Sequence, residues 1–409
     1  MQDNRSLFDE AGYLRLYRDL ATAVADGRLA SAWTHYDSYG RAEGRRPNDV
    51  DQDFYLRAYP LAAEEIARGR ATCAAEHYIS FGRARGWLPN AEAPRPADAS
   101  ASPSPFGGLW PDRPDAVDLI DGKLDCGLIT RKQAERLRFW VENGYLVLQK
   151  AIPEALIERA AQDLDRAYSG QIADLKFECH AIARDRIAWR PEISVHPSKA
   201  LDIHHFSPAI RYLIFSDPIA EFLALIFDAK SFVSQTLGFL RGSAQEGHQD
   251  SAYVPYTVAR QFAATWIALE DVTLGAGELF YYPGSHRLPD FLYYGLYKSV
   301  HEAKRLRGGA GLEEQVRAHV ASLESRAKES GLSRVPFAAK KGDVLFWHAD
   351  LVHGGHPVSR EVTRKSIVTH YCPKYRAPLF SEGLQTKIWH HEGHLYTSSH
   401  YLDREPVVA

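Results

Sequence analysis

The chain has 409 residues, of which 45% are hydrophobic and 11% aromatic, and this composition excludes a largely disordered protein. Lys and Arg total 49 against 52 Asp and Glu, and the resulting net charge of −3 is not that of a dedicated nucleic-acid-binding protein. The four cysteines form no CxxC pair, the first residues lack a signal-peptide pattern, and no apolar run is long enough to span a membrane. These features predict a cytoplasmic protein of two or three domains.

An internal repeat with an offset of 42 residues opens the chain. Residues 13–48 align with residues 55–90 without a gap, and 18 of the 36 positions are identical. Each copy predicts two short helices, the first ending at a glycine (Gly27, Gly69) and the second followed within a few residues by a proline. We therefore predict a small all-helical module of two tandem repeats over residues 1–92.

The composition changes after the repeats. Residues 93–108 are rich in Pro, Ala and Ser and nearly free of large apolar side chains, which predicts a flexible linker. A second domain is expected over residues 109–409. Its predicted helices are 131–144, 153–168 and 208–228, and its predicted strands are 145–148, 231–241, 261–272, 278–282, 343–348 and 364–372. Short strands without regular βαβ alternation favour a jelly roll, so the predicted class is α+β with helices flanking that core.

Residues 290–334 interrupt the strands with a charged, helical composition. Leu312, Val316 and Val320 have a spacing that places them on one face of a helix. Glycines suited to a hinge and tyrosines suited to stacking on a substrate occur at Gly308, Gly309 and Gly311 and at Tyr293, Tyr294 and Tyr297. The pattern predicts a mobile cover over the substrate entrance, and the alternative is a solvated insertion packed outside the barrel.

Two distant stretches contain residues that can bind a metal ion. In GSAQEGHQDSAYVPY, His248 and Asp250 are two residues apart, so in an extended strand their side chains project from one face. About a hundred residues later, KKGDVLFWHADLVHGGHPVSREVTRKS supplies His348, His353 and His356 as candidates for a third ligand. Two histidines and one carboxylate on one face form the facial arrangement of non-haem Fe(II) oxygenases.

An arginine follows these candidate ligands. Arg364 lies eleven residues after His353 and opens the strand RKSIVTHYC. A guanidinium group is suited to bidentate binding of a carboxylate, such as that of a cosubstrate next to the metal. The alternative is an ordinary exposed arginine on a strand.

Residues 120–380 resemble the phytanoyl-CoA dioxygenase family of Fe(II)/2-oxoglutarate oxygenases, because five motifs occur in the family's order. They are HQD (248–250), ATWIALEDV (264–272), GAGELFYYPGSHR (275–287), KGDVLFWHADLVHGG (341–355) and TRKSIVTHY (363–371). The resemblance implies a double-stranded β-helix, which is a jelly roll with the iron near one open end.

By position, the resemblance makes His248, Asp250 and His353 the Fe(II) ligands. It makes Arg364 the residue that binds the distal carboxylate of 2-oxoglutarate. Related iron halogenases have a small residue in place of the carboxylate ligand, so the presence of Asp250 favours hydroxylation over halogenation.

Further residues are implied to bind the cosubstrate. Trp266 matches a position that lines the 2-oxoglutarate pocket, and Gln249 matches a position near the cosubstrate. Gln235 and Thr236, on the preceding strand, are candidates for the other end of 2-oxoglutarate. The family often has a hydroxyl two residues after the distal histidine, where this chain has Gly355, so that contact must come from elsewhere.

The resemblance implies an enzyme that uses Fe(II), 2-oxoglutarate and molecular oxygen to hydroxylate an unactivated C–H bond of a small molecule. The repeats resemble a helical module attached to bacterial glycosyltransferases, which suggests a sugar or glycan-linked substrate and docking of a partner protein. The alternatives are a cupin-like metal-dependent isomerase and a catalytically degenerate jelly-roll protein that binds glycans. Arg364 and Trp266 count against the first, and the intact ligand set counts against the second.

Other histidines allow two further metal sites. His35 and His77 occupy equivalent places in the repeats, where packing is the simpler interpretation. In the tail IWHHEGHLYTSSHY, His390 and His394 have the spacing of a helical metal pair, and the alternatives are a packed tail or residues near the substrate.

Overall fold

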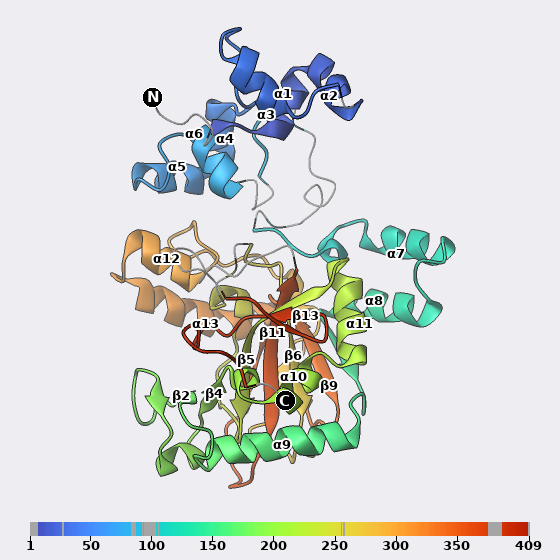
Figure 1. The fold of residues 1–409 in the computed structure, drawn as a ribbon. Helices are drawn as coiled ribbons and strands as arrows, with labels where there is room; N and C mark the ends of the chain where they lie inside the picture. Colours follow the sequence, from blue (N-terminus) through green and yellow to red (C-terminus); the bar gives the residue numbers. More distant parts are fainter. Residues whose placement is uncertain are drawn as a thin grey trace.

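The computed structural model describes residues 7–26, 28–82, 87–91, 93, 104, 106–254, 256, 258–374 and 387–407. The helices of the N-terminal repeats form one end of the molecule, and two β-sheets with their covering helices form the other (Figure 1). Gly27 and most of the predicted linker lie outside the described residues. Along the described chain, none of the helices is both long and apolar enough to cross a lipid bilayer.

The two sequence repeats fold into the same succession of short helices. The first copy contains α1 (Glu10–Leu16), α2 (Arg18–Ala25), α3 (Ala32–His35) and the π-helical turn η2 (Tyr36–Gly40), and the second contains α4 (Gln52–Ala58), α5 (Pro60–Ala67), α6 (Ala74–His77) and η3 (Tyr78–Gly82). In each copy a tyrosine hydroxyl meets a histidine Nδ1, at 3.1 Å for Tyr13 and His35 and at 3.0 Å for Tyr55 and His77. These histidines therefore support the packing of each repeat.

The structure corrects the predicted helix pattern of the repeats in one respect. The first helix of each copy is interrupted at Tyr17 or Tyr59, where ψ is 79° and 78°. In the second copy Pro60 follows the break, and the residue before a proline is disfavoured in a helical conformation. The last residue of each π-helical turn must be a glycine, because a Cβ at Gly82 would collide with the hydroxyl of Tyr55 and a Cβ at Gly40 would collide with that of Tyr13.

The remainder of the chain forms two largely antiparallel sheets. The larger sheet has the order β1-β9-β6-β11-β5-β4-β2-β3, and β13 joins it beside β5 and pairs with β12. Its strands are β1 (Tyr145–Leu148), β2 (Lys176–Glu178), β3 (Ile187–Ala188), β4 (Lys199–Leu201), β5 (Ser231–Phe239), β6 (Ala263–Ala268), β9 (Val344–His348), β11 (Ser366–Pro373), β12 (Trp389–His391) and β13 (His394–Tyr396). The smaller sheet, β10-β7-β8, contains β7 (Leu279–Tyr281), β8 (Val335–Phe337) and β10 (His353–Gly355).

Apolar side chains join the two sheets. Trp266 and Leu345 of the larger sheet belong to the same buried cluster as Leu279 and Phe337 of the smaller sheet. This arrangement confirms the predicted α+β class with a jelly-roll core. The sequence did not reveal the shortest strands, because two or three residues are too few to show alternation.

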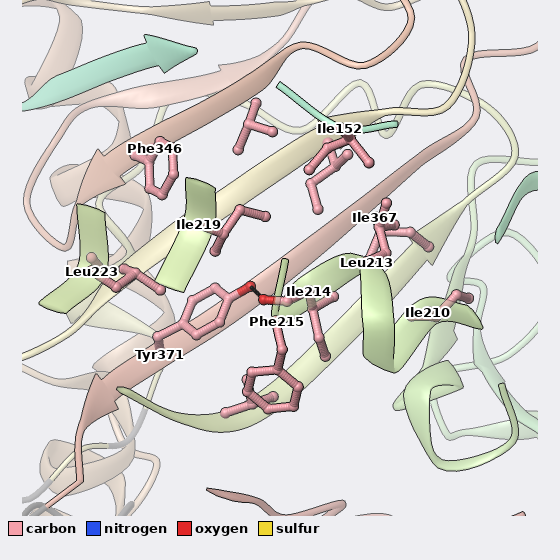
Figure 2. Close-up of a cluster of buried hydrophobic side chains, with 14 of the residues drawn as sticks. Ile152, Ile210, Leu213, Ile214, Phe215, Ile219, Leu223, Phe346, Ile367 and Tyr371 are labelled. Atoms are coloured by element: carbon pink, nitrogen blue, oxygen red, sulfur yellow. Dashed lines mark hydrogen bonds between the residues drawn. The ribbon is translucent and has the colours of Figure 1, made fainter. Parts of the chain in front are cut away.

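Helices cover the other face of the larger sheet. They are α8 (Arg131–Asn143), α9 (Glu154–Tyr168), α10 (Pro208–Ile214) and α11 (Asp217–Phe227), with α7 (Ala116–Asp125) beside α8. Figure 2 shows Ile219 of α11 and Leu213 of α10 among the strands that carry Phe346 and Ile367. The hydroxyl of Tyr371 donates to the carbonyl oxygen of Ile214 at 2.8 Å, which ties β11 to the end of α10.

The predicted helix 208–228 is two helices rather than one. The break falls at Phe215 and Ser216, between α10 and α11. Pro218 lies in the first turn of α11, where its missing N–H group removes no helical hydrogen bond.

The insertion between the strands contains α12 (Val300–Arg307) and α13 (Leu312–Glu329), and it packs against the second repeat. Tyr293 and Tyr297 are fully buried in a cluster that also contains Tyr55, and the hydroxyl of Tyr293 lies 2.7 Å from Nδ1 of His319. The prediction that these two tyrosines stack on a substrate is therefore wrong, because the helical repeat covers them.

The C-terminal segment returns to the larger sheet. Strands β12 and β13 form a hairpin, and β13 runs parallel to β5 with Leu395 opposite Phe232. His390 and His394 lie on these strands, so the predicted helical metal pair is wrong. Among the described residues, neither histidine belongs to a cluster of potential metal ligands.

Candidate metal and cosubstrate site

A cavity of about 730 Å³ lies between the inner face of the larger sheet and the smaller sheet. Gln235, Leu237 and Phe239 of β5 line it, because alternate side chains of a strand project from one face. The same alternation brings Val368 and His370 of β11 into the lining. The cavity wall therefore combines apolar and polar side chains.

Three side chains converge in this cavity. The potential ligand atoms of His248, Asp250 and His353 all lie within 4.8 Å of one another, and all three residues are buried. Oδ1 of Asp250 is 3.6 Å from Nε2 of His248 and 3.8 Å from Nε2 of His353. Among the described residues, this is the only such group of three. Two imidazoles and one carboxylate are a donor set that suits Fe(II) and leaves coordination positions open.

Backbone pairing holds the two histidines side by side. The N–H of His248 donates to the carbonyl oxygen of His353 at 2.9 Å, and the reverse bond is 3.0 Å. The segment before Gln249 is not a strand of the sheet, and Asp250 begins a 3₁₀ turn. Gln249 is nevertheless extended (φ −115°, ψ 127°), so the side chains on either side of it fall on one face, as the spacing predicted.

Hydrogen bonds fix the tautomer of both imidazoles. Nδ1 of His248 donates to the carbonyl oxygen of Glu246, and Nδ1 of His353 donates to that of Leu351, both at 2.9 Å. Each Nε2 therefore presents a lone pair toward Asp250, which is the form that binds a metal. The side-chain amide of Gln245 lies 3.1 Å from Nε2 of His248 and donates to that lone pair.

The second oxygen of Asp250 is held by other residues. The indole Nε1 of Trp347 donates to Oδ2 at 2.8 Å, and Nε2 of His370 lies 3.4 Å from the same oxygen. Burial opposes ionisation of Asp250, but at the low pH where this carboxyl titrates, the charge of His353 and hydrogen bonds from His248 and His370 keep its pKa well below the usual value. Burial also lowers the pKa of His353 to about 4. An ionised carboxylate beside a neutral imidazole is the state that metal binding requires.

Arg364 is a buried cation with no anionic partner among the residues that the structure describes. It is 1% exposed, Nη1 donates to the carbonyl oxygen of Gly277 at 2.6 Å, and Nε has no hydrogen-bond partner. Among the described residues, no carboxylate lies within 4.0 Å of its guanidinium group. Burial lowers its pKa to about 10 against the opposing charge of Glu278, so the group stays protonated at neutral pH. A buried, unpaired guanidinium group that lines a cavity is suited to binding a carboxylate ligand.

The structure brings together only part of the predicted cosubstrate set. Trp266 and Gln235 line the cavity, and the guanidinium carbon of Arg364 lies 5.7 Å from the ring centroid of Trp266. Thr236 follows Gln235 on β5 and so projects to the opposite face, where its hydroxyl lies 2.7 Å from Nδ1 of His204. Adjacent residues of one strand cannot both face the cavity, which the prediction did not take into account.

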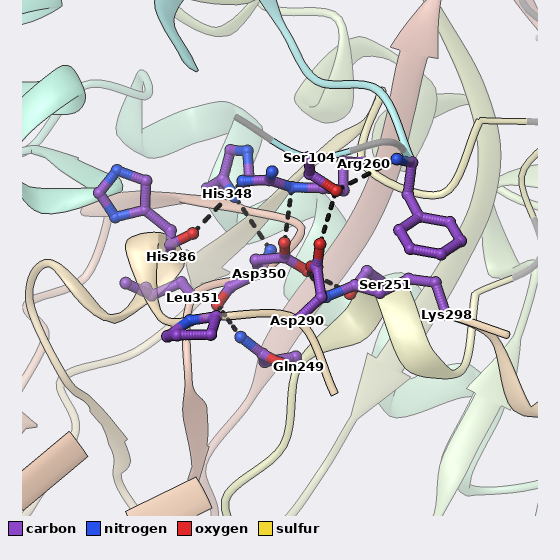
Figure 3. Close-up of polar contacts among 12 residues, drawn as sticks. Ser104, Gln249, Ser251, Arg260, His286, Asp290, Lys298, His348, Asp350 and Leu351 are labelled. Atoms are coloured by element: carbon purple, nitrogen blue, oxygen red, sulfur yellow. Dashed lines mark hydrogen bonds and ion pairs between the residues drawn. The ribbon is translucent and has the colours of Figure 1, made fainter. Parts of the chain in front are cut away.

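Gln249 is also directed away from the cavity. Its amide donates to the carbonyl oxygen of Asp350 at 2.7 Å, in the buried polar network of Figure 3. In that network the carboxylate of Asp350 lies 2.6 Å from Nε of Arg260 and 3.1 Å from Nζ of Lys298. The prediction that Gln249 lies near the cosubstrate is wrong, and its side chain instead ties the HQD segment to the loop before His353.

Two alternative ligands are excluded by their positions. Nε2 of His348 lies 3.0 Å from the carboxylate of Asp112, and its Nδ1 accepts from the N–H of Asp350. His356 lies near Arg334 and is not part of the group of three. Neither histidine lines the cavity.

Ser243 is a polar residue of the site that the sequence analysis missed. Its hydroxyl lines the cavity and lies 3.1 Å from the position that a Cβ on Gly355 would occupy. The hydroxyl expected after the distal histidine is thus offered from the loop that precedes His248. No sequence signal indicated this, because only the fold brings the two segments together.

The outer wall of the cavity is formed by segments that contain no recognised motif. It contains Glu178, Arg186 and Lys199 near β2 and β4, His301, Glu302 and Arg305 of α12, and Ser399, His400 and Leu402 of the C-terminal segment. Arg186 and Arg305 are exposed, so this wall faces solvent. The predicted cover segment does border the cavity through α12.

Comparisons with known proteins give consistent matches. The sequence profile of the phytanoyl-CoA dioxygenase (PhyH) family matches residues 140–366. Peroxisomal phytanoyl-CoA dioxygenase of Bos taurus is 23% identical over 251 residues, covering 58% of this chain and 68% of that protein. A probable phytanoyl-CoA dioxygenase of Caenorhabditis elegans is 24% identical over 261 residues, covering 58% and 75%. The solved structure of the non-heme alpha ketoglutarate dependent epimerase SnoN, from nogalamycin biosynthesis, matches at 17% identity with a TM-score of 0.41, covering 60% of this chain and 85% of that one.

Proposed function

Because the chain belongs to the phytanoyl-CoA dioxygenase family and is an Fe(II)- and 2-oxoglutarate-dependent oxygenase, we propose that it hydroxylates an unactivated C–H bond of a hydroxyl-bearing small molecule, such as a sugar or a glycan-linked compound. His248, Asp250 and His353 are the proposed iron ligands. Arg364 is the proposed partner of the distal carboxylate of 2-oxoglutarate, in a pocket with Trp266.

One observation carries this proposal. Three ligand atoms within 4.8 Å of one another share a cavity with a buried guanidinium group that has no carboxylate partner in the described part of the chain. The first feature suits a divalent cation, and the second suits a dicarboxylate bound beside it. A glycan-binding protein would need neither feature, and an isomerase with another metal would not need Arg364.

The bound iron, with 2-oxoglutarate and molecular oxygen, supplies the oxidising power that converts C–H into C–OH while 2-oxoglutarate becomes succinate and carbon dioxide. The residues of the chain hold and orient the reactants. Trp347 and His370 hold one oxygen of Asp250 and so leave the other free for the metal. Arg364 and Ser243 offer donors to the cosubstrate, and Trp266 closes the pocket against water.

The size and lining of the cavity support a polar small molecule as the substrate. A volume of about 730 Å³ is within the range of small-molecule sites. Gln245 and Ser399 offer hydrogen-bonding groups, while Tyr253 offers an aromatic surface. A polar substrate can form further hydrogen bonds with these groups, whereas an apolar chain would bury them without adding any.

The test is to measure succinate formation by the purified full chain. Fe(II) and 2-oxoglutarate should both be required, and a matching hydroxylated probe should stimulate the rate. Candidate sugars, lipids and acyl carriers are supplied in parallel, and hydroxylated product is identified by mass spectrometry. Failure of the chain to produce succinate from 2-oxoglutarate with Fe(II) under any condition would contradict the proposal.

The proposed division of labour assigns residues 109–409 to this chemistry and residues 1–92 to a helical module, joined by residues 93–108. The burial of Tyr297 beside the second repeat supports a module that braces the cover segment. An ion pair of 2.6 Å between Arg307 of α12 and Glu64 of α5 adds to that contact. Docking of a partner protein through the repeats stays a prediction, which a binding measurement with a candidate glycan enzyme would check.

A further inference from the structure

The C-terminal segment is a fixed part of the cavity wall. Ser399, His400 and Leu402 line the cavity, and the residues around them are anchored by hydrogen bonds to the larger sheet. The N–H of Thr397 donates to the carbonyl oxygen of Val233 at 2.9 Å. The buried hydroxyl of Tyr401 accepts from the N–H of Lys176 at 2.7 Å and lies 3.2 Å from the carbonyl oxygen of Leu201.

A buried carboxylate orients His400 within this wall. Nδ1 of His400 lies 2.7 Å from Oδ2 of Asp202, and the two side chains are 5% and 0% exposed. Oδ1 of Asp202 accepts from the N–H of Thr236 at 3.1 Å, and the N–H of Asp202 donates to the carbonyl oxygen of Thr236 at 2.8 Å. The plane of the imidazole is thus set from β5, which is the strand that also carries Gln235 into the cavity.

Asp202 is held in an unusual conformation. Its φ of 49° lies in the left-handed region, which is uncommon for residues other than glycine. Such conformations persist where the surrounding structure imposes them, and they are concentrated at functional sites. Burial opposes ionisation of Asp202, but the hydrogen bond from His400 holds its pKa below the ordinary value. The carboxylate therefore accepts the Nδ1–H of His400.

This arrangement determines what His400 offers to the cavity. With Nδ1 used as a donor, the neutral ring has a free lone pair at Nε2, for which no partner exists among the described residues. The nearby charges in the same wall are Glu178, Lys199 and Arg186, and the first two form an ion pair of 3.0 Å. Since that pair is already satisfied and Arg186 is exposed to solvent, His400 is the buried hydrogen-bonding group of this wall, which suits an uncharged polar group.

Building on the proposed function, we propose that His400 is a substrate-binding residue whose Nε2 forms a hydrogen bond with a hydroxyl group of the substrate, and that Asp202 is its positioning residue. A hydroxyl can donate to the neutral imidazole and can also accept from the protonated one. A carboxylate or phosphate group would bind only the protonated ring. The substrate class that fits this position is therefore a hydroxyl-bearing compound.

Two substitutions of nearly the same size separate the contributions of the two ring nitrogens. His400→Asn keeps an amide donor near the place of Nδ1, in reach of Asp202, but has no atom at the place of Nε2. His400→Gln instead extends its amide toward the place of Nε2.

The probes are methyl glycosides of common monosaccharides and their monodeoxy analogues. Binding to the full chain is measured by ligand-observed NMR in the absence of iron, and then kcat/KM for probe-stimulated succinate formation is measured with iron.

We expect the wild-type chain to bind one hydroxylated probe about five- to tenfold more tightly than its deoxy analogue, as one neutral hydrogen bond provides. His400→Asn should abolish that difference, His400→Gln should retain most of it, and Asp202→Asn should reduce it. A purely structural role of His400 would weaken both members of a probe pair equally.

Two outcomes would overturn this assignment. They are a hydroxyl preference that survives in His400→Asn, and a wild-type chain that binds none of the glycosides. Because the NMR measurement needs no oxidation chemistry, it is independent of the proposed function. A chain that binds the glycosides through His400 but forms no succinate would instead contradict the oxygenase proposal while leaving this one intact.

Discussion

The inner end of the cavity and its outer wall differ in how far their charged groups are paired within the protein. At the inner end, the lone pairs of two imidazoles face Asp250, and Arg364 has no carboxylate within 4.0 Å among the described residues. In the outer wall, Lys199 pairs with Glu178 at 3.0 Å, and His400 is bound to the buried Asp202. The first region is incomplete without an added cation and an added anion, whereas the second is largely satisfied by its own residues.

This difference indicates what each region binds. Burying an unpaired charge is costly, so a site retains one where a bound ligand supplies the counter-charge. The inner end therefore suits the metal and the dicarboxylate cosubstrate. The outer wall, where Glu178 and Lys199 neutralise each other, is the region where we propose that the substrate is recognised by hydrogen bonding.

The largest expected effect is that of removing a charge from the inner end. Asp250→Ala should abolish turnover, to below about 1% of wild type, because the chain loses one of three ligands and the only negative one. The measurement is succinate formation with Fe(II), accompanied by metal binding under anaerobic conditions. Asp118→Ala, which changes an exposed carboxylate on α7, is the control and should behave as wild type. Activity near wild type in Asp250→Ala would remove this residue from the ligand set.

The next largest effect is expected from substitution of Arg364, which should change the KM for 2-oxoglutarate. A charge-assisted pair with a carboxylate is worth about 1.5–3 kcal/mol, so Arg364→Ala should raise the KM for 2-oxoglutarate roughly ten- to a hundredfold. Arg364→Lys keeps the charge but lacks the bidentate geometry and should show an intermediate KM. Affinity for Fe(II), measured separately, should change little. The assignment fails if iron affinity collapses while the KM for 2-oxoglutarate stays the same.

The two regions also differ in how far the sequence predicts them. The inner end is encoded by short motifs. Strand alternation places His248 and Asp250 on one face, and the family resemblance selects His353 over His348 and His356 and identifies Arg364. Alternation also shows where the predictions failed, since Gln249 lies on the opposite side of an extended segment from its two neighbours. Applied to the strand after Arg364, the same rule would have placed His370 in the cavity.

The outer wall was not predictable in the same way. It joins α12, the region of β2 and β4, and the C-terminal segment, which are up to about 200 residues apart in sequence. Asp202 and His400 carry no motif, and they meet because β4 and β13 both pair with β5. Long-range pairing of this kind depends on the whole fold and leaves no periodic signal in a single sequence.

A smaller effect is expected from the residues that hold Asp250. Trp347→Phe removes the 2.8 Å hydrogen bond to Oδ2 but keeps an aromatic ring against His353. Partners of this kind tune metal affinity by about 10- to 100-fold, and we expect about tenfold weaker Fe(II) binding because His370 remains beside the same oxygen. Anaerobic titration with Co(II), followed by its absorption spectrum, measures both affinity and geometry. The same affinity and spectrum as wild type would show that Trp347 does not position the carboxylate.

The last prediction concerns His204, which anchors the C-terminal segment of the outer wall. Its substitution should have the smallest effect at neutral pH, and the effect on stability should be clearest on acidification. His204 lies 2.7 Å from the hydroxyl of Thr236 and 2.9 Å from the carbonyl oxygen of Thr397, and so links β5 to the C-terminal segment. Burial lowers its pKa to about 4, with Arg211 and His205 acting in the same direction and Asp202 opposing them.

In the folded state, His204 therefore stays neutral at pH values where the same side chain of the unfolded state is already protonated (pKa near 6.5). The free energy of unfolding is thus undiminished above pH 6.5 and falls as the pH decreases toward 4. The loss from this group should reach about 3 kcal/mol. His204→Gln keeps a donor for Thr397 but cannot titrate, so urea unfolding at pH 7 and pH 4.5 should show a smaller acid loss in this variant than in wild type. His196→Gln, which replaces an exposed histidine, is the control and should lose as much stability as wild type. Equal acid sensitivity of all three chains would show that His204 is not the group that loosens the outer wall.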